Sequence, residues 1–178
     1  SVPAAIAGGK LYTFAGREVL AKFTLAGDWV VGDNGVNLVG TSTRLVPRGQ
    51  TAASYNQRIG LQELPSWVNP VRLGKEYLSL IMDECAAGSL KPIEQGSVSG
   101  FATDVLILEC TDNATQTVKL VYAALVQGQR STLVFSRLSL LPSKSDNPSA
   151  VAQSELAVFK QLIANLYVCM PGTPKLCQ

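Results

Sequence analysis

Four consecutive segments with the pattern of β-strands fill the stretch from Ile93 to Leu140. Apolar residues alternate with polar ones, or form short apolar runs, over residues 93–101, 104–110, 117–127 and 131–140. Turn-forming residues separate these segments, including Gly100 and the pair Gly128-Gln129. Strands joined by such short connections pair with their neighbours in the chain. The pattern therefore predicts a four-stranded antiparallel meander.

The first third of the chain also indicates strands. Alternation over residues 11–14 and 19–25 predicts two strands, and residues 36–46 and 59–65 predict two more. Between the first and second pairs, glycine, Asp and Asn at 27–28 and 32–35 favour turns around Trp29. Thr51 is interpreted as the cap of a single helical turn that runs through Tyr55.

Two segments have the signals of long helices. Asn69-Pro70 and Asn147-Pro148 each combine an N-cap residue with Pro at the first helical position. Apolar residues at helical spacing follow, up to Gly88 in the first helix and to near Tyr167 in the second. The fold predicted is α+β, a mainly antiparallel β-sheet covered by two long helices in a single-domain sandwich over residues 1–178. Residues 1–9 are expected to be a flexible lead and residues 171–178 a tail held by a disulfide.

Charge and composition argue against several classes of function. Lys and Arg number 15 against 13 Asp and Glu, so the net charge of +2 provides no surface for nucleic acid. Histidine is absent, which removes the usual general base and the commonest metal ligand. We therefore expect no catalytic residue, no metal and no cofactor. The longest apolar run, Leu120 to Val126, is far below the roughly 20 residues of a membrane-spanning helix. The first nine residues are read as a mature N-terminus, and no lipid anchor is visible in the chain.

Four cysteines bear on the compartment. Cys85, Cys110, Cys169 and Cys177 can pair in three ways, and their spacing fits no zinc motif. Disulfides are the favoured interpretation, with buried free thiols as the alternative. A periplasmic or secreted location follows from disulfides. We predict that Cys85 pairs with Cys110, because the helix that carries Cys85 must pack on the sheet in which Cys110 ends a strand.

Two segments resemble catalytic patterns but lack the residue or the geometry that the chemistry requires. Gly96-Ser97-Val98-Ser99-Gly100 resembles the turn that carries a hydrolase nucleophile, but Val98 holds the central position. Asp83 and Glu84 are adjacent on a predicted helix and point about 100° apart, so they do not converge on a substrate. The sequence predicts that the protein is not an enzyme.

The binding residues predicted are Arg48, Tyr55, Arg58 and Trp67. Residues 47–55 and 65–70 are Pro-containing connections, which usually lie at the surface. Trp, Tyr and Arg are also the residue types that dominate the energy of protein interfaces. We expect the two connections to form one corner. The alternative is that Tyr55 and Trp67 close the end of the sheet as part of the core.

One segment resembles a known group of proteins. Val46-Pro47-Arg48-Gly49-Gln50-Thr51 is followed by Tyr55 and by Ile59-Gly60-Leu61-Gln62. It resembles the Val-Pro-x-Gly-x-Thr motif, the aromatic residue and the strand of a family of small secreted or periplasmic bacterial proteins of unassigned activity, some of them predicted lipoproteins. Cys85, Cys110 and Cys169 match the family's cysteine places. Arg48 stands where the family more often has an acidic residue, and Tyr55 where it more often has Trp. The order of elements is also similar to the PsbP-like sandwich, which is an analogy of fold alone.

These observations lead to three hypotheses of function. The first is a non-catalytic protein of the bacterial cell envelope that binds another protein or assists assembly, for example in an envelope or secretion complex. The second is a periplasmic carrier of a small ligand in an apolar pocket between sheet and helices. The third is an enzyme that works without histidine. The first is preferred, and its partner is a protein that the sequence does not identify.

Overall fold

The computed structural model describes residues 8–37, 40–68, 88–112, 117–142 and 148–170 of the chain. In these ranges the chain forms ten β-strands and one α-helix. The strands are β1 (Gly9–Ala15), β2 (Leu20–Ala26), β3 (Trp29–Asn37), β4 (Gly40–Pro47), β5 (Gln57–Pro65), β6 (Gly88–Val98), β7 (Phe101–Asp112), β8 (Thr117–Gln127), β9 (Ser131–Pro142) and β10 (Tyr167–Cys169). The helix, α2, covers Pro148–Ala164.

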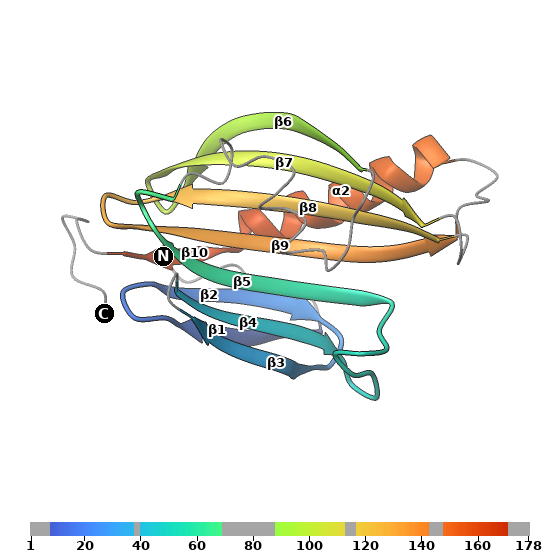
Figure 1. Ribbon diagram of the computed structural model, residues 1–178, viewed down its shortest axis with the longest axis horizontal. Helices are drawn as coiled ribbons and strands as arrows, with labels where there is room; N and C mark the ends of the chain where they lie inside the picture. The colour runs from blue at the N-terminus through green and yellow to red at the C-terminus, as the bar shows by residue number, and fades with distance from the viewer. Residues whose placement is uncertain (1–7, 38–39, 69–87, 113–116, 143–147, 171–178) are drawn as a thin grey trace.

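The strands form two sheets. The large sheet is antiparallel and has seven strands in the order β3-β4-β5-β9-β8-β7-β6. The small sheet has three strands in the order β1-β2-β10. Figure 1 shows β6 and β3 at opposite edges of the large sheet, with α2 behind β7 and β8. The predicted meander is confirmed as the consecutive neighbours β6, β7, β8 and β9.

The main core lies between the large sheet on one side and the small sheet with α2 on the other. Aromatic rings connect these parts: Phe135 of β9 lies 5.4 Å from Phe23 of β2 and 6.2 Å from Phe159 of α2, measured between ring centroids. Phe159 also stacks on Tyr122 of β8, at 5.7 Å. Truncation of such a buried ring typically costs about 3–5 kcal/mol. These rings therefore hold the helix and both sheets together.

A second apolar cluster covers the opposite face of the large sheet. It includes Leu106 and Leu108 of β7, Val121 and Leu125 of β8 and Val134 of β9. Residues 120–126 of β8 are consequently buried on both faces of the sheet. A strand buried on both faces needs no alternation of apolar and polar residues. This explains why the longest apolar run of the sequence is a central strand.

The predicted α+β fold with two long helices is wrong. The protein is mostly antiparallel β-structure, and the described residues contain a single helix, α2. The first predicted helix falls on residues 69–87, outside the described residues, and Gly88, expected to cap it, instead begins β6. The second helix ends at Ala164 rather than near Tyr167. There the N–H of Asn165 bonds the Leu162 carbonyl and the chain enters β10, so that Tyr167 pairs with Lys22.

The prediction of turns between Trp29 and Val36 is also wrong. The glycines of this segment lie in β3, which pairs with β4, and the register shifts between Val31 and Asp33. This shift marks a β-bulge at Gly32, where the two strands continue to pair on both sides. The predicted strand 36–46 is therefore a hairpin of β3 and β4. The turn predicted from Thr51 is not helical, because Thr51 pairs with Ser54 in an isolated β-bridge.

The ends of the chain are described only in part. Of the predicted lead 1–9, only Gly8 and Gly9 lie within the described residues, and Gly9 begins β1. The tail 171–178 lies outside them.

Candidate functional site

One end of β5 is fixed to the small sheet by a buried carboxylate. Glu63 follows Ile59 and Leu61 on the face of β5 that meets the main core, and only 4% of it is exposed. Its carboxylate accepts the backbone N–H groups of Arg17 at 2.9 Å, Glu18 at 2.8 Å and Val19 at 2.7 Å. Hydrogen bonds to a charged acceptor are the strong ones. Glu63 therefore holds the β1–β2 turn against β5.

Trp67 is displayed at this same end. The chain leaves β5 in a tight turn in which the Val68 N–H donates to the Pro65 carbonyl at 3.0 Å. The Ser66 N–H donates to the Arg130 carbonyl in the β8–β9 turn, at 2.9 Å. Val68 is buried in the second apolar cluster, whereas 79% of Trp67 is exposed. The backbone on both sides of Trp67 is thus held in place while the side chain faces solvent.

Charged side chains lie beside this turn. The Arg130 guanidinium donates to Glu18 Oε1 at 2.5 Å, and Ser131 Oγ donates to Glu18 Oε2 at 3.0 Å. Arg17, next to Glu18, is exposed. We call Trp67, Arg130, Glu18 and Arg17 the Trp67 surface. It combines one large exposed ring with two arginines on connected, hydrogen-bonded turns.

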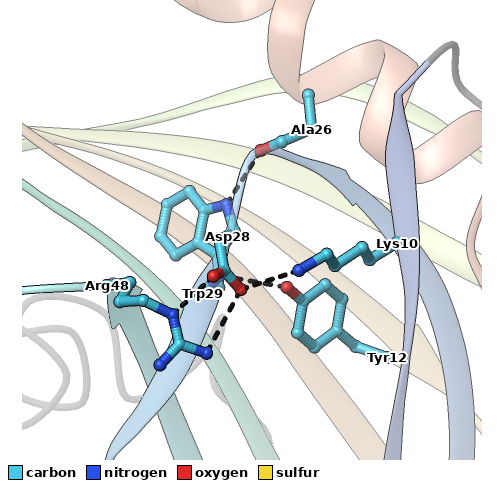
Figure 2. A network of polar contacts seen from close by, with 6 residues as sticks. All are labelled: Lys10, Tyr12, Ala26, Asp28, Trp29 and Arg48. Carbon is cyan, nitrogen blue, oxygen red and sulfur yellow. Dashed lines mark hydrogen bonds and ion pairs between the residues drawn. The ribbon is translucent and has the colours of Figure 1, made fainter.

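Arg48 belongs to a different network at the opposite end of β5. Because Trp29 pairs with Pro47, Asp28 and Arg48 lie opposite each other, and the Arg48 N–H donates to the Asp28 carbonyl at 2.9 Å. The Arg48 side chain makes an ion pair with the Asp28 carboxylate, which Lys10 Nζ also contacts at 3.0 Å (Figure 2). Arg48 first, and Lys10 second, lower the pKa of Asp28 below its ordinary value.

Trp29 sits within this network rather than beyond it. Its N–H donates to the Tyr12 hydroxyl oxygen at 3.0 Å, and its indole Nε1 donates to the Ala26 carbonyl at 3.0 Å (Figure 2). The ring packs against the main core. Since Tyr12 and Lys10 are on β1, these contacts connect the small sheet to the start of β3 in the large sheet.

Tyr55 and Arg58 lie together at this second end. The Arg58 guanidinium carbon lies 5.1 Å from the centroid of the Tyr55 ring, a cation–π contact. Tyr55 is half-buried against the second apolar cluster. Arg58 is only 4% exposed, so the prediction that it lies at the surface is wrong. Its position in β5, paired with Leu138 of β9, accounts for this burial.

The predicted residues therefore do not form one corner. Gln57, at the start of β5, pairs with Ser139, whereas Pro65, at its end, pairs with Ser131. A nine-residue strand at about 3.3 Å per residue separates its ends by roughly 26 Å. Arg48, Tyr55 and Arg58 lie near one end and Trp67 near the other. The exposure expected of Trp67 is found, and its role as a core plug is excluded.

A buried ion pair fixes α2 on the large sheet. Arg137 of β9 pairs with Glu155 of α2, and Ser139 Oγ donates to the same Glu155 oxygen at 2.8 Å. The Tyr122 hydroxyl donates to the Ala152 carbonyl at 2.8 Å. Burial lowers the pKa of Arg137 and raises the pKa of Tyr122. Every one of these side chains is engaged with another group, which makes the cluster structural.

A cleft of about 230 Å³ lies between α2 and the edge of the large sheet. Lys160, Ile163 and Ala164 of α2 form one wall, and the other is made by β6 and β7. Lys160 and Glu94 form an ion pair at 3.2 Å across it. The volume is below the roughly 300–1,000 Å³ of common ligand pockets. The small-ligand hypothesis requires a pocket between sheet and helix, and this cleft lies there but is smaller than common ligand pockets.

The described residues also bear on metal binding, membrane insertion and disulfides. In the described ranges no group of three or more His, Cys, Asp or Glu side chains is placed to hold a metal ion. Nor is any helix there long and apolar enough to cross a membrane. Cys110 and Cys169 are both disulfide-bonded. Cys85 and Cys177 lie outside the described residues, so the pairing of Cys85 with Cys110 stays a prediction.

Sequence reasoning missed the role of Glu63. The alternation of Ile59, Leu61 and Glu63 along one strand was a usable signal, because it places all three side chains on the same face. A carboxylate on a buried face must find hydrogen-bond donors. The donors come from a turn more than forty residues earlier in the chain, which the sequence pattern does not bring to Glu63.

No family model matches the chain, and no curated protein matches it. Among solved structures, the chain is similar to a point mutant of the protein Mog1. The TM-score is 0.54 with 9% identity, over 89% of this chain and 95% of that chain. A second structure is LpqN of Mycobacterium tuberculosis, described as involved in cell envelope biogenesis, with TM-score 0.48 and 9% identity over 96% of this chain and 100% of that chain. At this identity the similarity to Mog1 shows a shared fold and nothing of function.

Proposed function

We propose that this protein is a non-catalytic component of the bacterial cell envelope that docks on another protein through the Trp67 surface. The observation that carries the proposal is the 79% exposure of Trp67 on a turn whose backbone is hydrogen-bonded on both sides. Trp is usually buried to a large extent in soluble proteins. An exposed Trp on a fixed turn contributes nothing to the core and is available to a partner.

The composition and stiffness of the surface support this role. Trp and Arg are enriched among the residues that dominate binding energy. Association costs free energy for every side chain and loop that must be ordered. Here the turn is held by the Ser66 and Val68 hydrogen bonds, and Arg130 is held by Glu18. The turn and Arg130 are therefore already ordered in the free protein, which lowers the free-energy cost of binding a partner.

The compartment is proposed from the cysteines and from the sequence. Disulfides persist in the periplasm and outside the cell, whereas they are rare in the cytosol. Cys110 and Cys169 are both disulfide-bonded. The motif from Val46 to Thr51, with its resemblance to secreted and periplasmic proteins, agrees with this compartment. The lack of histidine supports the non-catalytic part of the proposal.

Site-specific photo-crosslinking in the native host tests the proposal. A photo-reactive phenylalanine analogue replaces Ser66, the exposed neighbour of Trp67, in one strain and Val31 in a control strain, since Val31 is 55% exposed on β3. Trp67 is kept in both strains, and we expect one defined crosslinked partner from position 66 and none from position 31. Arg130→Ala in the strain with the analogue at position 66 should weaken that crosslink, because Arg130 belongs to the same surface. Equal crosslinking from both positions, or none from position 66, would contradict the proposal.

A further inference from the structure

Strand β6 is one of the two edge strands of the large sheet. It pairs with β7 on one side and, within the described ranges, with no strand on the other. Figure 1 shows it as the outermost strand on its side of the sheet. Residues 94–97 are all exposed. Exposed edges are usually protected by bulges, Pro or charge, because their unpaired backbone groups attract other strands.

That protection covers only part of β6. Pro92, which has no N–H, and a bulge between Pro92 and Glu94 interrupt the first half of the strand. From Glu94 to Val98 the strand is regular, and it ends in the Ser99-Gly100 turn. Both turn residues have positive φ, 52° and 84°, as a two-residue type I′ hairpin requires. The regular edge therefore runs from Glu94 to Val98.

The hairpin defines which backbone groups face outward. In a two-residue hairpin the flanking pair, Val98 and Phe101, exchanges backbone hydrogen bonds, and such pairs then alternate along the ladder. Gly96 and Glu94 accordingly bond to Thr103 and Val105. The N–H and C=O groups of Gln95 and Ser97 point away from β7. They offer two donors and two acceptors to an added strand.

The cleft beside α2 lies under this same edge. Gly96 lines it and pairs with Thr103, which also lines it, so both residues face the same side of the sheet. A Cβ on Gly96 would meet nothing within 4 Å, so the missing side chain leaves space there. A residue of an added strand opposite Gly96 would point its side chain to the same face. Val98, Val105 and Ile163 give the cleft an apolar lining.

From this juxtaposition we propose that β6 and the cleft bind an extended segment of another polypeptide by strand addition. The segment pairs with Gln95 and Ser97 and places one aliphatic side chain in the cleft opposite Gly96. Main-chain bonds with a side-chain pocket are the recognised chemistry of this mode of binding. A second copy of the chain fits less well, because so short an edge buries far less than the roughly 1,600 Å² of a stable interface.

This site is separate from the Trp67 surface. Trp67 follows β5, and three strands lie between β5 and β6 in the large sheet. At about 4.8 Å between neighbouring strands, the two strands are roughly 19 Å apart. The peptide site therefore succeeds or fails independently of the proposed function.

The test selects peptides on the intact protein and then asks which residues they need. A displayed library of random decapeptides is panned on the immobilised protein, and the most enriched peptide is synthesised and titrated. Gln95→Pro removes an outward N–H but no bond to β7, and Gln95→Ala is its matched control. We expect Gln95→Pro to weaken binding about tenfold and Gln95→Ala to leave it unchanged. Gly96→Val should fill the cleft and also weaken binding about tenfold or more.

Several outcomes would overturn the proposal. They are a library without enriched peptides, equal affinity for wild type and Gln95→Pro, or a loss of affinity in Trp67→Ala. Loss in Gly96→Val with full binding by Gln95→Pro would indicate a ligand of the cleft alone. A dimer that Gln95→Pro dissociates would identify a second copy as the occupant. If Gln95→Pro does not fold, the wild type is titrated with the peptide and the NMR chemical shifts of the Gln95 and Ser97 backbone amides are followed. Strand addition must change both shifts, and unchanged shifts would overturn the proposal.

Discussion

Two carboxylates connect the small sheet to the large sheet, one at each end of β5, and their surroundings differ. Glu63 is buried and accepts three backbone N–H groups from the β1–β2 turn. Asp28 is partly exposed and pairs with the side chains of Arg48 and Lys10. The Glu63 contact is between a carboxylate and backbone N–H groups in a buried environment. The Asp28 contact is between flexible side chains that water reaches.

This difference shows which end of β5 is held more firmly and how that end relates to the exposed Trp67. An exposed ion pair is screened by water and by salt and contributes little. A buried carboxylate that satisfies several backbone donors cannot be removed without leaving those donors unpaired. The end that carries Glu63 is therefore the firmly held end, and it is also the end that displays Trp67. The end that carries Asp28 is closed by weaker contacts.

The largest effect is expected from Glu63→Ala. It leaves the N–H groups of Arg17, Glu18 and Val19 without their acceptor, and we expect a loss of about 3 kcal/mol in the free energy of unfolding. For a domain of this size that lowers the melting temperature by about 6–12 °C. Thermal and urea denaturation measure it. Glu63→Gln keeps one acceptor oxygen and should recover part of the loss; equal stability of wild type and Glu63→Ala would refute the role of the carboxylate.

Gly16→Ala is a second test of the contact between Glu63 and the β1–β2 turn. A Cβ on Gly16 would lie 2.5 Å from Glu63 Oε2, which its hydrogen bonds keep in place. We expect a loss of about 2 kcal/mol. In the Glu63→Ala background the added methyl group meets no carboxylate, so its cost should fall below about 1 kcal/mol. A double-mutant cycle by urea denaturation provides the comparison, and strictly additive losses would show that Gly16 and Glu63 are not coupled.

Tyr12→Phe addresses the neutral contact at the Asp28 end. It removes the hydroxyl that accepts the Trp29 N–H and leaves the ring in place. The expected loss is about 1 kcal/mol, smaller than for Glu63→Ala because a single neutral hydrogen bond is removed. Urea denaturation with Tyr55→Phe as the control measures it. A loss as large as that of Glu63→Ala would contradict the ranking of the two ends.

The smallest effect is expected from Asp28→Asn, and it depends on pH. Arg48 and Lys10 lower the pKa of Asp28 in the folded protein below its ordinary value of 3.8. A lowered folded-state pKa contributes stability above pH 3.8 that is lost as the pH falls through the folded value. Wild type should therefore be slightly more stable than Asp28→Asn at pH 7, and the two should converge in acid, below the folded-state pKa. Salt at about 1 M should reduce the difference at pH 7; a difference that grows in acid would contradict this account.

Local pattern predicted the strands that have neighbours in sequence. The β6 to β9 meander follows from alternation and turn residues between Ile93 and Leu140. The pattern failed at β3, where Gly32 and Gly35 indicated turns, although Gly35 pairs with Ser42 of β4 and Gly32 is the bulge in the same pair of strands. It also failed at β10, three residues whose only reason to be a strand is the edge of β2. These segments are strands because they pair with another strand, β4 for β3 and β2 for β10. The local sequence pattern does not contain that information.

The site was predicted in the same uneven way. The exposure of Trp67 followed from a Pro-bounded connection. The grouping of Trp67 with Arg48 did not hold, because the length of β5 separates them. Arg58 lies in a strand rather than a loop and is buried. Residue types at a surface can be named from sequence, whereas their distances depend on the strands between them.

The most direct test of the account is the affinity of Trp67→Ala for the partner identified by crosslinking, measured together with its melting temperature. Arg48→Ala is the matched control, since Arg48 is an exposed predicted residue at the opposite end of β5. We predict that Trp67→Ala weakens binding by about 2 kcal/mol or more, roughly thirtyfold, with an unchanged melting temperature, and that Arg48→Ala binds as wild type. Full binding by Trp67→Ala, or a melting temperature lower by several degrees, would contradict the account.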